Sequence, residues 1–137
     1  MIRPVTYEDK EFWLSIDKHS TERLFESKVR DKLGYVVEFD GKMVGVMHYN
    51  LLWDNMPFLN FIYFESEYRR KGLGREAMLY WEEEMKRNGF PMTMISTQAD
   101  EGAQHFYRKL GYKDSGCIVL NDCPMAQPLE IFMTKIL

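Results

Sequence analysis

The chain has 137 residues, which is enough for one domain with an ordinary hydrophobic core and too short for two domains of usual size. Apolar residues make up 45% and charged residues 28%, a globular balance that excludes disordered and fibrous classes. The formal net charge of −3 provides no long-range attraction for nucleic acid.

No membrane segment or metal site is expected from the sequence. Charged residues occupy positions 3 and 8–10, before any apolar run that could form a secretory signal. The longest apolar stretch, 57–64, is too short to cross a bilayer. Cys117 and Cys123 have no second pair to complete a zinc site, so we expect reduced thiols in a cytoplasmic protein, with a disulfide as the lesser alternative.

The N-terminal half predicts a short strand, two helices and a strand meander. The strand covers 2–5, and helices follow Thr6 and cover about 21–32, the second with Leu24, Phe25 and Val29 facing inward. Strands are expected at 35–39, 43–52 and 58–64. Asp40-Gly41 joins the first two of these as a two-residue hairpin turn.

The C-terminal half predicts two further helices between strands. The clearest helix covers 72–88, because its apolar residues share one face, and Gly89 ends it. A strand at 92–97, a short helix at 101–110 and closing strands at 112–120 and 129–137 complete the chain. This order predicts an α/β (α+β) fold with a mixed, mostly antiparallel sheet of six to seven strands and helices on both faces.

A glycine-containing basic segment precedes the long helix and predicts an anion site. Gly72 and Gly74 allow a ligand to approach the backbone closely, and the first amides of a helix have no helical acceptor. These amides and the helix dipole suit a pyrophosphate, with Arg70, Lys71 and Arg75 adding positive charge.

Residues 72–77 also match the dinucleotide-binding pattern G-x-G-x-x-A, but the context does not. That pattern requires a strand running directly into the first glycine, and seven mostly charged residues intervene here. It also requires an acidic residue about twenty positions later, where this chain has the predicted strand 92–97. We therefore reject a dinucleotide site.

Two blocks of the sequence resemble motifs of the GNAT superfamily of acyl-CoA N-acyltransferases. Residues 69–74 (RRKGLG) are similar to its R/Q-x-x-G-x-G/A motif, and residues 103–112 (AQHFYRKLGY) to its A-x-x-F-Y-x-x-x-G-F/Y segment. The spacing of the blocks and the order of predicted elements also fit, from one end of the chain to the other. The resemblance implies a single GNAT-like domain over 1–137 with the acyl-CoA N-acyltransferase fold.

The resemblance also implies where acetyl-CoA, the co-substrate, would bind. The main chain of Ile62, Tyr63 and Phe64 would pair with the pantetheine arm, as an added strand does. Asp100 stands where many members have an Asn that contacts the cofactor, which is a departure from the family pattern. The pyrophosphate would be bound by the loop formed by Arg69, Arg70, Lys71, Gly72, Leu73, Gly74 and Arg75.

Tyr107 matches the family tyrosine beside the cofactor sulfur, where a phenol can protonate the leaving thiolate. Its place on the same helix face as Phe106 leaves a core role open. The general base stays unassigned, because Phe58 and Ile95 occupy the positions where other members have a Glu. The candidates left are Glu65, His48, and waters bound by Asn60 or Thr97.

The function implied is transfer of an acetyl group from acetyl-CoA to a primary amine by direct attack on the thioester. A small-molecule amine is favoured, since Asp54 and Asp122 would suit a small cation, and a protein amine remains open. A homodimer fits the family. The alternative is a non-catalytic acyl-CoA-binding or interaction module, which the missing carboxylate base favours.

Overall fold

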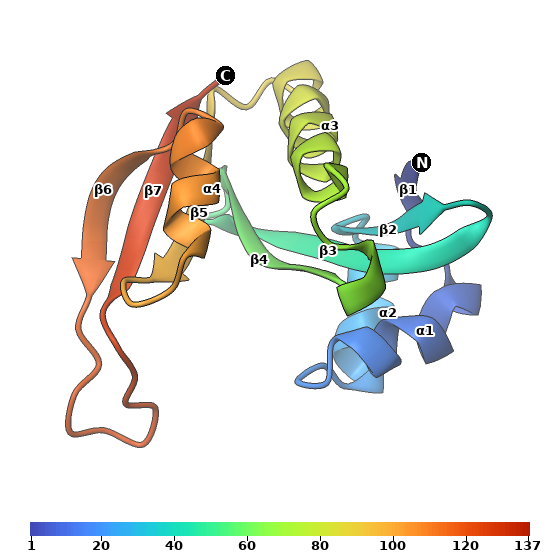
Figure 1. Cartoon of the computed structure of the whole chain (residues 1–137), viewed down its shortest axis with the longest axis horizontal. Helices are drawn as coiled ribbons and strands as arrows, with labels where there is room; N and C mark the ends of the chain where they lie inside the picture. Colours follow the sequence, from blue (N-terminus) through green and yellow to red (C-terminus); the bar gives the residue numbers. More distant parts are fainter. The chain divides into compact units, whose positions relative to one another are not determined.

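A computed structural model describes residues 1–137 and contains a seven-stranded sheet in the order β1-β2-β3-β4-β5-β7-β6 (Figure 1). β4 and β5 pair in parallel through Phe58 and Met94, and the registers of β1–β2, β2–β3, β5–β7 and β6–β7 are antiparallel. The prediction of a mixed, mostly antiparallel sheet is confirmed. The strands are β1 (Ile2–Pro4), β2 (Gly34–Phe39), β3 (Lys42–Leu52), β4 (Met56–Phe64), β5 (Met92–Gln98), β6 (Lys113–Ile118) and β7 (Glu130–Ile136).

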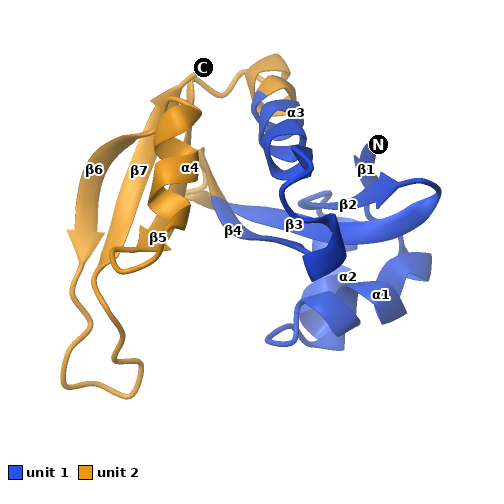
Figure 2. Ribbon diagram, viewed as in Figure 1, with its two compact units in different colours: residues 1–50, 59–82 blue, residues 51–58, 83–137 orange.

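The chain forms two compact units (Figure 2). The first consists of Met1–Asn50 and Leu59–Glu82, and the second of Leu51–Phe58 and Glu83–Leu137. The helices are α1 (Lys10–Ile16), α2 (Glu22–Arg30), α3 (Leu73–Arg87) and α4 (Ala103–Lys109). Each element lies within a few residues of its predicted range, with the largest differences at helix ends, where capping rather than apolar periodicity sets the boundary.

In the first unit, helices cover both faces of the sheet, as predicted. Neighbouring residues of a strand point to opposite faces. On β3, His48 stacks on Trp13 of α1 at 5.3 Å between ring centroids, whereas Tyr49 packs on Trp81 of α3 at 5.6 Å. α1 and α2 therefore cover one face of β2–β4, and the N-terminal part of α3 covers the other (Figure 1).

The orientation predicted for α2 is wrong at one position. Leu24 was expected to face inward, but it is 51% exposed, while Phe25 is fully buried. Lys28, one turn after Phe25, is buried on the same side. The apolar stripe of this nine-residue helix is narrow and does not determine how the helix is rotated about its axis. Tertiary packing therefore decides which of the residues beside the stripe face the core.

Two glycine positions fix the local path of β2, β3 and β4. Asp40 and Gly41 both have positive φ, 52° and 75°, as the tight hairpin turn between β2 and β3 requires. On β3, a Cβ at Gly45 would lie 2.4 Å from the ring of Phe64. Only glycine therefore lets the last residue of β4 pack against β3.

In the second unit, β5 and β7 form the centre of the sheet and β6 its edge. Ile95 and Met133 are buried opposite each other in the β5–β7 register, and Phe58 stacks on Phe132 at 5.8 Å between ring centroids. All of β6 is exposed. None of the helices in the structure combines the length and apolar character that a membrane span requires.

Candidate active site

The loop between β4 and α3 has the backbone geometry of an anion site. Arg70 and Gly72 have positive φ, 62° and 79°, so the chain turns sharply before the helix. Gly72 acts as the N-cap residue, because its carbonyl accepts the hydrogen bond from the Glu76 amide at 3.1 Å. The amides of the first helical turn, which begins at Leu73, have no helical acceptor, and the positive end of the α3 dipole reinforces them.

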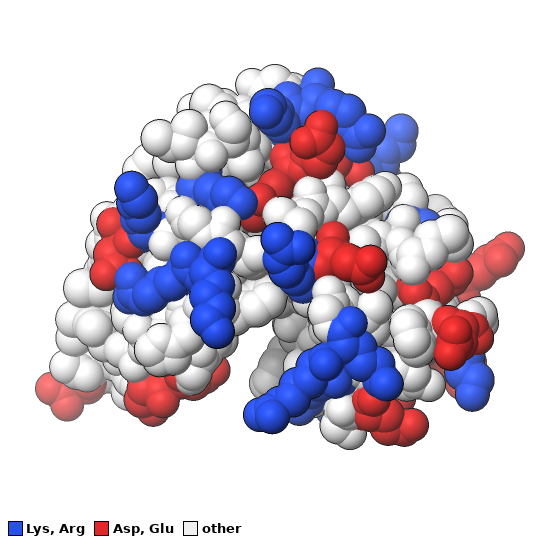
Figure 3. All heavy atoms as spheres, turned by 45° about the horizontal axis from the view of Figure 1, so that its top comes forward, with Lys and Arg blue, Asp and Glu red and all other residues white.

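The basic side chains of the loop differ in their contacts and in their exposure. Arg69 turns back onto β4: its Nε donates to the carbonyl of Phe64 at 3.1 Å, and its guanidinium lies 4.6 Å from the ring centroid of Tyr63. Arg70 and Arg75 are exposed and are the side chains with freedom to meet further phosphates. On the face in Figure 3, Lys and Arg side chains form separate groups with acidic residues beside several of them.

In the sheet order β4 lies between β3 and β5, and its register with β5 contains one residue pair, Phe58 with Met94, which precedes Ile62–Phe64 in the strand. The backbone of Ile62–Phe64 therefore presents one edge to which an extended amide-bearing chain can add. The Phe64 carbonyl already accepts from Arg69, so a second donor would have to share that oxygen, which has two lone pairs. The predicted pantetheine strand and the pyrophosphate loop are separated in the chain only by the turn 65–68.

Tyr107 and Asp100 lie in the second unit. Tyr107, on α4, is only 7% exposed, and burial raises the pKa of its phenol to about 12. Its ring packs edge-on against Phe106 and Tyr112, with centroids 5.1 and 5.9 Å away. The phenol therefore keeps its proton at neutral pH. Asp100 is exposed in the turn between β5 and α4.

The two apolar residues at the positions noted for a base, Phe58 and Ile95, lie in the second unit. Ile95 is buried and Phe58 stacks on another ring. Of the other candidates, Glu65 is half-buried just after β4, and its amide donates to the carbonyl of Val44 at 3.0 Å. Asn60 is exposed on β4, and Thr97 is buried on β5.

His48 is held in a closed aromatic environment. Its ring is stacked between Trp13 and Phe61, each 5.3 Å away between centroids. Nε2 lies 2.9 Å from Oδ2 of Asp17, and Nδ1 is buried without a partner. Nε2 therefore carries the proton and donates to Asp17. His48 therefore connects the end of α1 to β3, and the same residue also lines the second cavity described below.

The His48 environment predicts a pH dependence of stability. Burial lowers the pKa of His48 below its ordinary value of 6.5. Below about pH 6.5, His48 is protonated in the unfolded chain while it stays neutral in the folded chain. The free energy of unfolding is therefore highest above about pH 6.5 and decreases as the pH falls toward the lower pKa of the folded state. Urea unfolding between about pH 5 and pH 8 measures this slope. A His48→Gln variant with the same slope would contradict the assignment.

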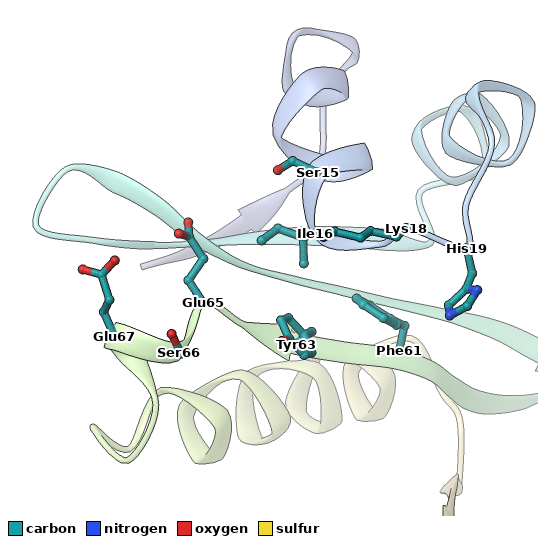
Figure 4. A pocket seen from close by; sticks show the side chains of 9 residues that line it. All are labelled: Ser15, Ile16, Lys18, His19, Phe61, Tyr63, Glu65, Ser66 and Glu67. Atoms are coloured by element: carbon teal, nitrogen blue, oxygen red, sulfur yellow. The ribbon is translucent and has the colours of Figure 1, made fainter.

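A first cavity, of about 570 Å³, lies between the end of α1 and the end of β4 (Figure 4). Ile16, Lys18 and His19 form one wall, and the rings of Phe61 and Tyr63 form the other. Glu65 and Glu67 line its end beside the turn after β4. Of the base candidates, only Glu65 lines this cavity.

A second cavity, of about 450 Å³, shares His19 and Phe61 with the first, and two of the base candidates from the sequence, His48 and Asn60, line it. Its floor contains Lys28, whose Nζ donates to the Tyr49 carbonyl at 2.7 Å and to Oδ1 of Asn50 at 2.5 Å. Burial lowers the pKa of Lys28 to about 8. The available signal was the spacing of Lys28 from Phe25, which places a charge on the buried face of α2.

Neither unit contains a group of three or more His, Cys, Asp or Glu side chains arranged to hold a metal ion. Cys117 and Cys123 are free and exposed. The first unit therefore combines a sharp glycine turn at a helix N-terminus with two adjoining cavities beside β4, and the second unit contains a buried phenol.

The fold is shared with solved N-acetyltransferases of low sequence identity. The ribosomal-protein-S18-alanine N-acetyltransferase from Escherichia coli superposes with a TM-score of 0.82 at 20% identity, covering 99% of this chain and 92% of that one. A GNAT family acetyltransferase from Elizabethkingia anophelis with acetyl-CoA bound gives 0.78 at 16%, covering 100% and 97%. Spermidine/spermine N-acetyltransferase SpeG from Vibrio cholerae gives 0.80 at 15%, covering 99% and 91%.

At the level of sequence, the search of curated proteins gives no match. The family model described as Acetyltransferase (GNAT) family matches residues 2–112, which include the glycine loop and the Tyr107 block. The resemblance found in the two motifs is thereby confirmed over most of the chain. The chain belongs to the GNAT family of acetyltransferases and is an acetyltransferase.

Proposed function

We propose that this protein transfers an acetyl group from acetyl-CoA to a primary amine, with the cofactor bound along β4 and on the loop before α3. The observation that supports this proposal most is that the strand edge at Ile62–Phe64 is followed in the chain by a turn, capped by Gly72, of the kind that binds anions. The strand edge pairs with the amides of pantetheine, and the turn binds the pyrophosphate. Arg70 and Arg75 supply charge, and Arg69 orients the end of β4.

The chemistry is a direct transfer. The neutral amine attacks the thioester carbonyl, a C–N bond forms and the C–S bond breaks. Tyr107 donates its proton to the departing thiolate and is reprotonated by solvent. Because the pKa of this phenol is about 12, the phenol is protonated at neutral pH and its proton is available when the C–S bond breaks. The amine loses its proton to water.

The acceptor is proposed to be a small molecule. Both cavities beside β4 are small, about 570 and 450 Å³, and suit compact ligands better than a folded protein surface. Related folds serve both kinds of acceptor, since the names of two matched proteins specify a ribosomal protein alanine and spermidine or spermine. A protein amine is therefore the second candidate, and it is included in the test.

The test is a titration of the purified protein with acetyl-CoA by calorimetry, followed by a screen for release of free thiol with a panel of small amines and of peptides with free N-termini. We expect saturable binding and thiol release with at least one small amine. Binding without turnover on any amine or peptide would favour the non-catalytic acyl-CoA module. Absence of binding by folded protein would contradict the proposed function altogether.

A further inference from the structure

The ammonium group of Lys28 is a buried charge without a counter-ion. Lys28 is 8% exposed, and both of its hydrogen bonds go to neutral oxygens, the Tyr49 carbonyl and Oδ1 of Asn50. Buried charges are costly unless they are paired. Asp17 and Asp31 act on Lys28 only from a distance, and neither forms an ion pair with it. An ammonium has three N–H donors, so one remains beside the second cavity.

Asn50 places a second donor beside that ammonium. Its Oδ1 accepts from Lys28, which fixes the orientation of the amide and leaves its NH₂ group without a hydrogen bond in the structure. Lys28 and the exposed residue Asn50 both line this cavity, and the hydrogen bond between them holds the two donor groups close together. The complement of a cation and an adjacent N–H donor is a group with two acceptor oxygens and a negative charge.

The rest of the cavity favours a carboxylate over a phosphate. Asp17 lines the same cavity and is paired only with His48, which burial keeps neutral. A phosphate, with close to two negative charges, would be repelled by this carboxylate more strongly than a carboxylate would be. Leu24 and Phe61 add an apolar wall suited to a short hydrocarbon body.

The position of the cavity along β4 connects it to the proposed function. The cavity is lined by Asn60 and Phe61, which directly precede the strand edge at Ile62–Phe64. A cofactor with its pyrophosphate after Phe64 and its pantetheine along this edge runs back along β4, so its thioester lies toward Asn60. Two residues of strand span about 7 Å, so an acceptor anchored in the cavity needs only a short body to reach the thioester.

We propose, on the basis of the function proposed above, that the acceptor is a small amino acid-like compound whose carboxylate is bound by Lys28 and Asn50 and whose amine is acetylated. The ligand supplies the negative charge that the buried ammonium lacks. Its apolar body lies against Leu24 and Phe61. The amine, at the other end of the molecule, points along β4.

The experiment compares each of three amino acids whose amine and carboxylate lie at opposite ends, 4-aminobutyrate, 5-aminopentanoate and 6-aminohexanoate, with its own carboxamide. The pairs differ in charge and hardly in size. With wild-type protein and acetyl-CoA, we expect kcat/KM for at least one acid to exceed that of its amide by about 10- to 100-fold, the effect of one hydrogen-bonded ion pair. Calorimetry of the same pairs in the presence of coenzyme A measures binding without relying on turnover.

Two variants remove the recognition in different ways. Lys28→Gln deletes the charge but keeps a donor for the Tyr49 carbonyl, and Asn50→Asp gives Lys28 an internal partner and repels the ligand. Both should reduce the acid-to-amide ratio to about one and raise KM for the acid more than they lower kcat. Lys113→Gln, an exposed lysine of β6, makes the same change in net charge as a control and should keep the ratio.

The outcomes separate this inference from the proposed function. Turnover with equal preference for acids and amides would overturn the inference and leave the proposed function intact. Binding of acids that depends on Lys28, without turnover, would support the pocket and contradict the enzymatic function. Inhibition by inorganic phosphate at the concentrations at which the acids bind, lost in Lys28→Gln, would assign the pocket to a phosphate instead.

Discussion

Replacing Gly74 with Glu is expected to reduce the affinity for acetyl-CoA by at least about 100-fold, or about 2.7 kcal/mol. Gly74 lies in the first turn of α3, where the backbone amides face the proposed pyrophosphate. A carboxylate there places like charges together. The same carboxylate is favourable for the helix dipole, so the fold should be unaffected. Calorimetric titration with acetyl-CoA measures the loss.

Gly74→Gln is the matched control, because Gln has nearly the size of Glu without its charge. If charge repulsion causes the loss, Gly74→Gln should lose clearly less affinity for acetyl-CoA than Gly74→Glu. If the side chain only blocks the close approach of the cofactor to the backbone, the two variants should lose the same affinity. Gly72→Glu is a less specific change, since the φ of 79° at Gly72 would add backbone strain. Wild-type affinity in Gly74→Glu would place the pyrophosphate elsewhere.

Replacing Tyr107 with Phe is expected to lower kcat by about 100-fold, the lower end of the range for a general acid, with little change in affinity for acetyl-CoA. The phenol is buried, with a pKa of about 12, so it is protonated throughout the working pH range. Its ring contacts with Phe106 and Tyr112 survive in the variant. Thiol release under conditions in which solvent viscosity has no effect on the rate measures the chemical step.

Tyr112→Phe provides the control within the same aromatic cluster. The Tyr112 hydroxyl shares a hydrogen bond of 2.9 Å with Oγ1 of Thr93, so its loss should lower the free energy of unfolding by about 1 kcal/mol and leave kcat unchanged. Tyr107→Phe should instead lower kcat and leave the free energy of unfolding nearly unchanged. Unchanged turnover in Tyr107→Phe, with chemistry limiting the rate, would leave Tyr107 a core residue only.

The proposed recognition of a carboxylate differs from the cationic acceptor expected from the sequence. Asp54 and Asp122 were singled out because acidic residues suit a cationic amine. The structure places both in turns of the second unit with positive φ, 62° and 51°. Such turns favour Asp for backbone reasons alone. The buried cation Lys28 is the more informative charge, since burial without a partner needs an explanation.

The contacts of the arginines in the loop before α3 could be found only from the structure, because side chains of the same charge have different neighbours there. Arg69, Arg70 and Arg75 are equivalent in the motif, yet Arg69 alone folds back onto Phe64 and Tyr63. Composition near a glycine turn indicates that positive charge is available. It does not indicate which guanidinium finds an acceptor within its own chain.

The sequence by itself determined the features that depend on a few consecutive residues. These are the hairpin turn at Asp40-Gly41, the α3 stripe, the glycine turn at Gly72 and the motif around Tyr107, all confirmed in position. Their physical causes are local: a positive φ, a helical repeat, unpaired first-turn amides.

Only the tertiary structure decided the features built from distant residues. Lys28 meets Asn50 across 22 positions, and Asp17 meets His48 across 31. Both contacts depend on the register of β3, and the first depends also on the rotation of α2, which turned Leu24 outward and Lys28 inward. A strand register and a helix rotation are set by the packing of whole faces, so no short segment of the sequence contains enough information to fix them.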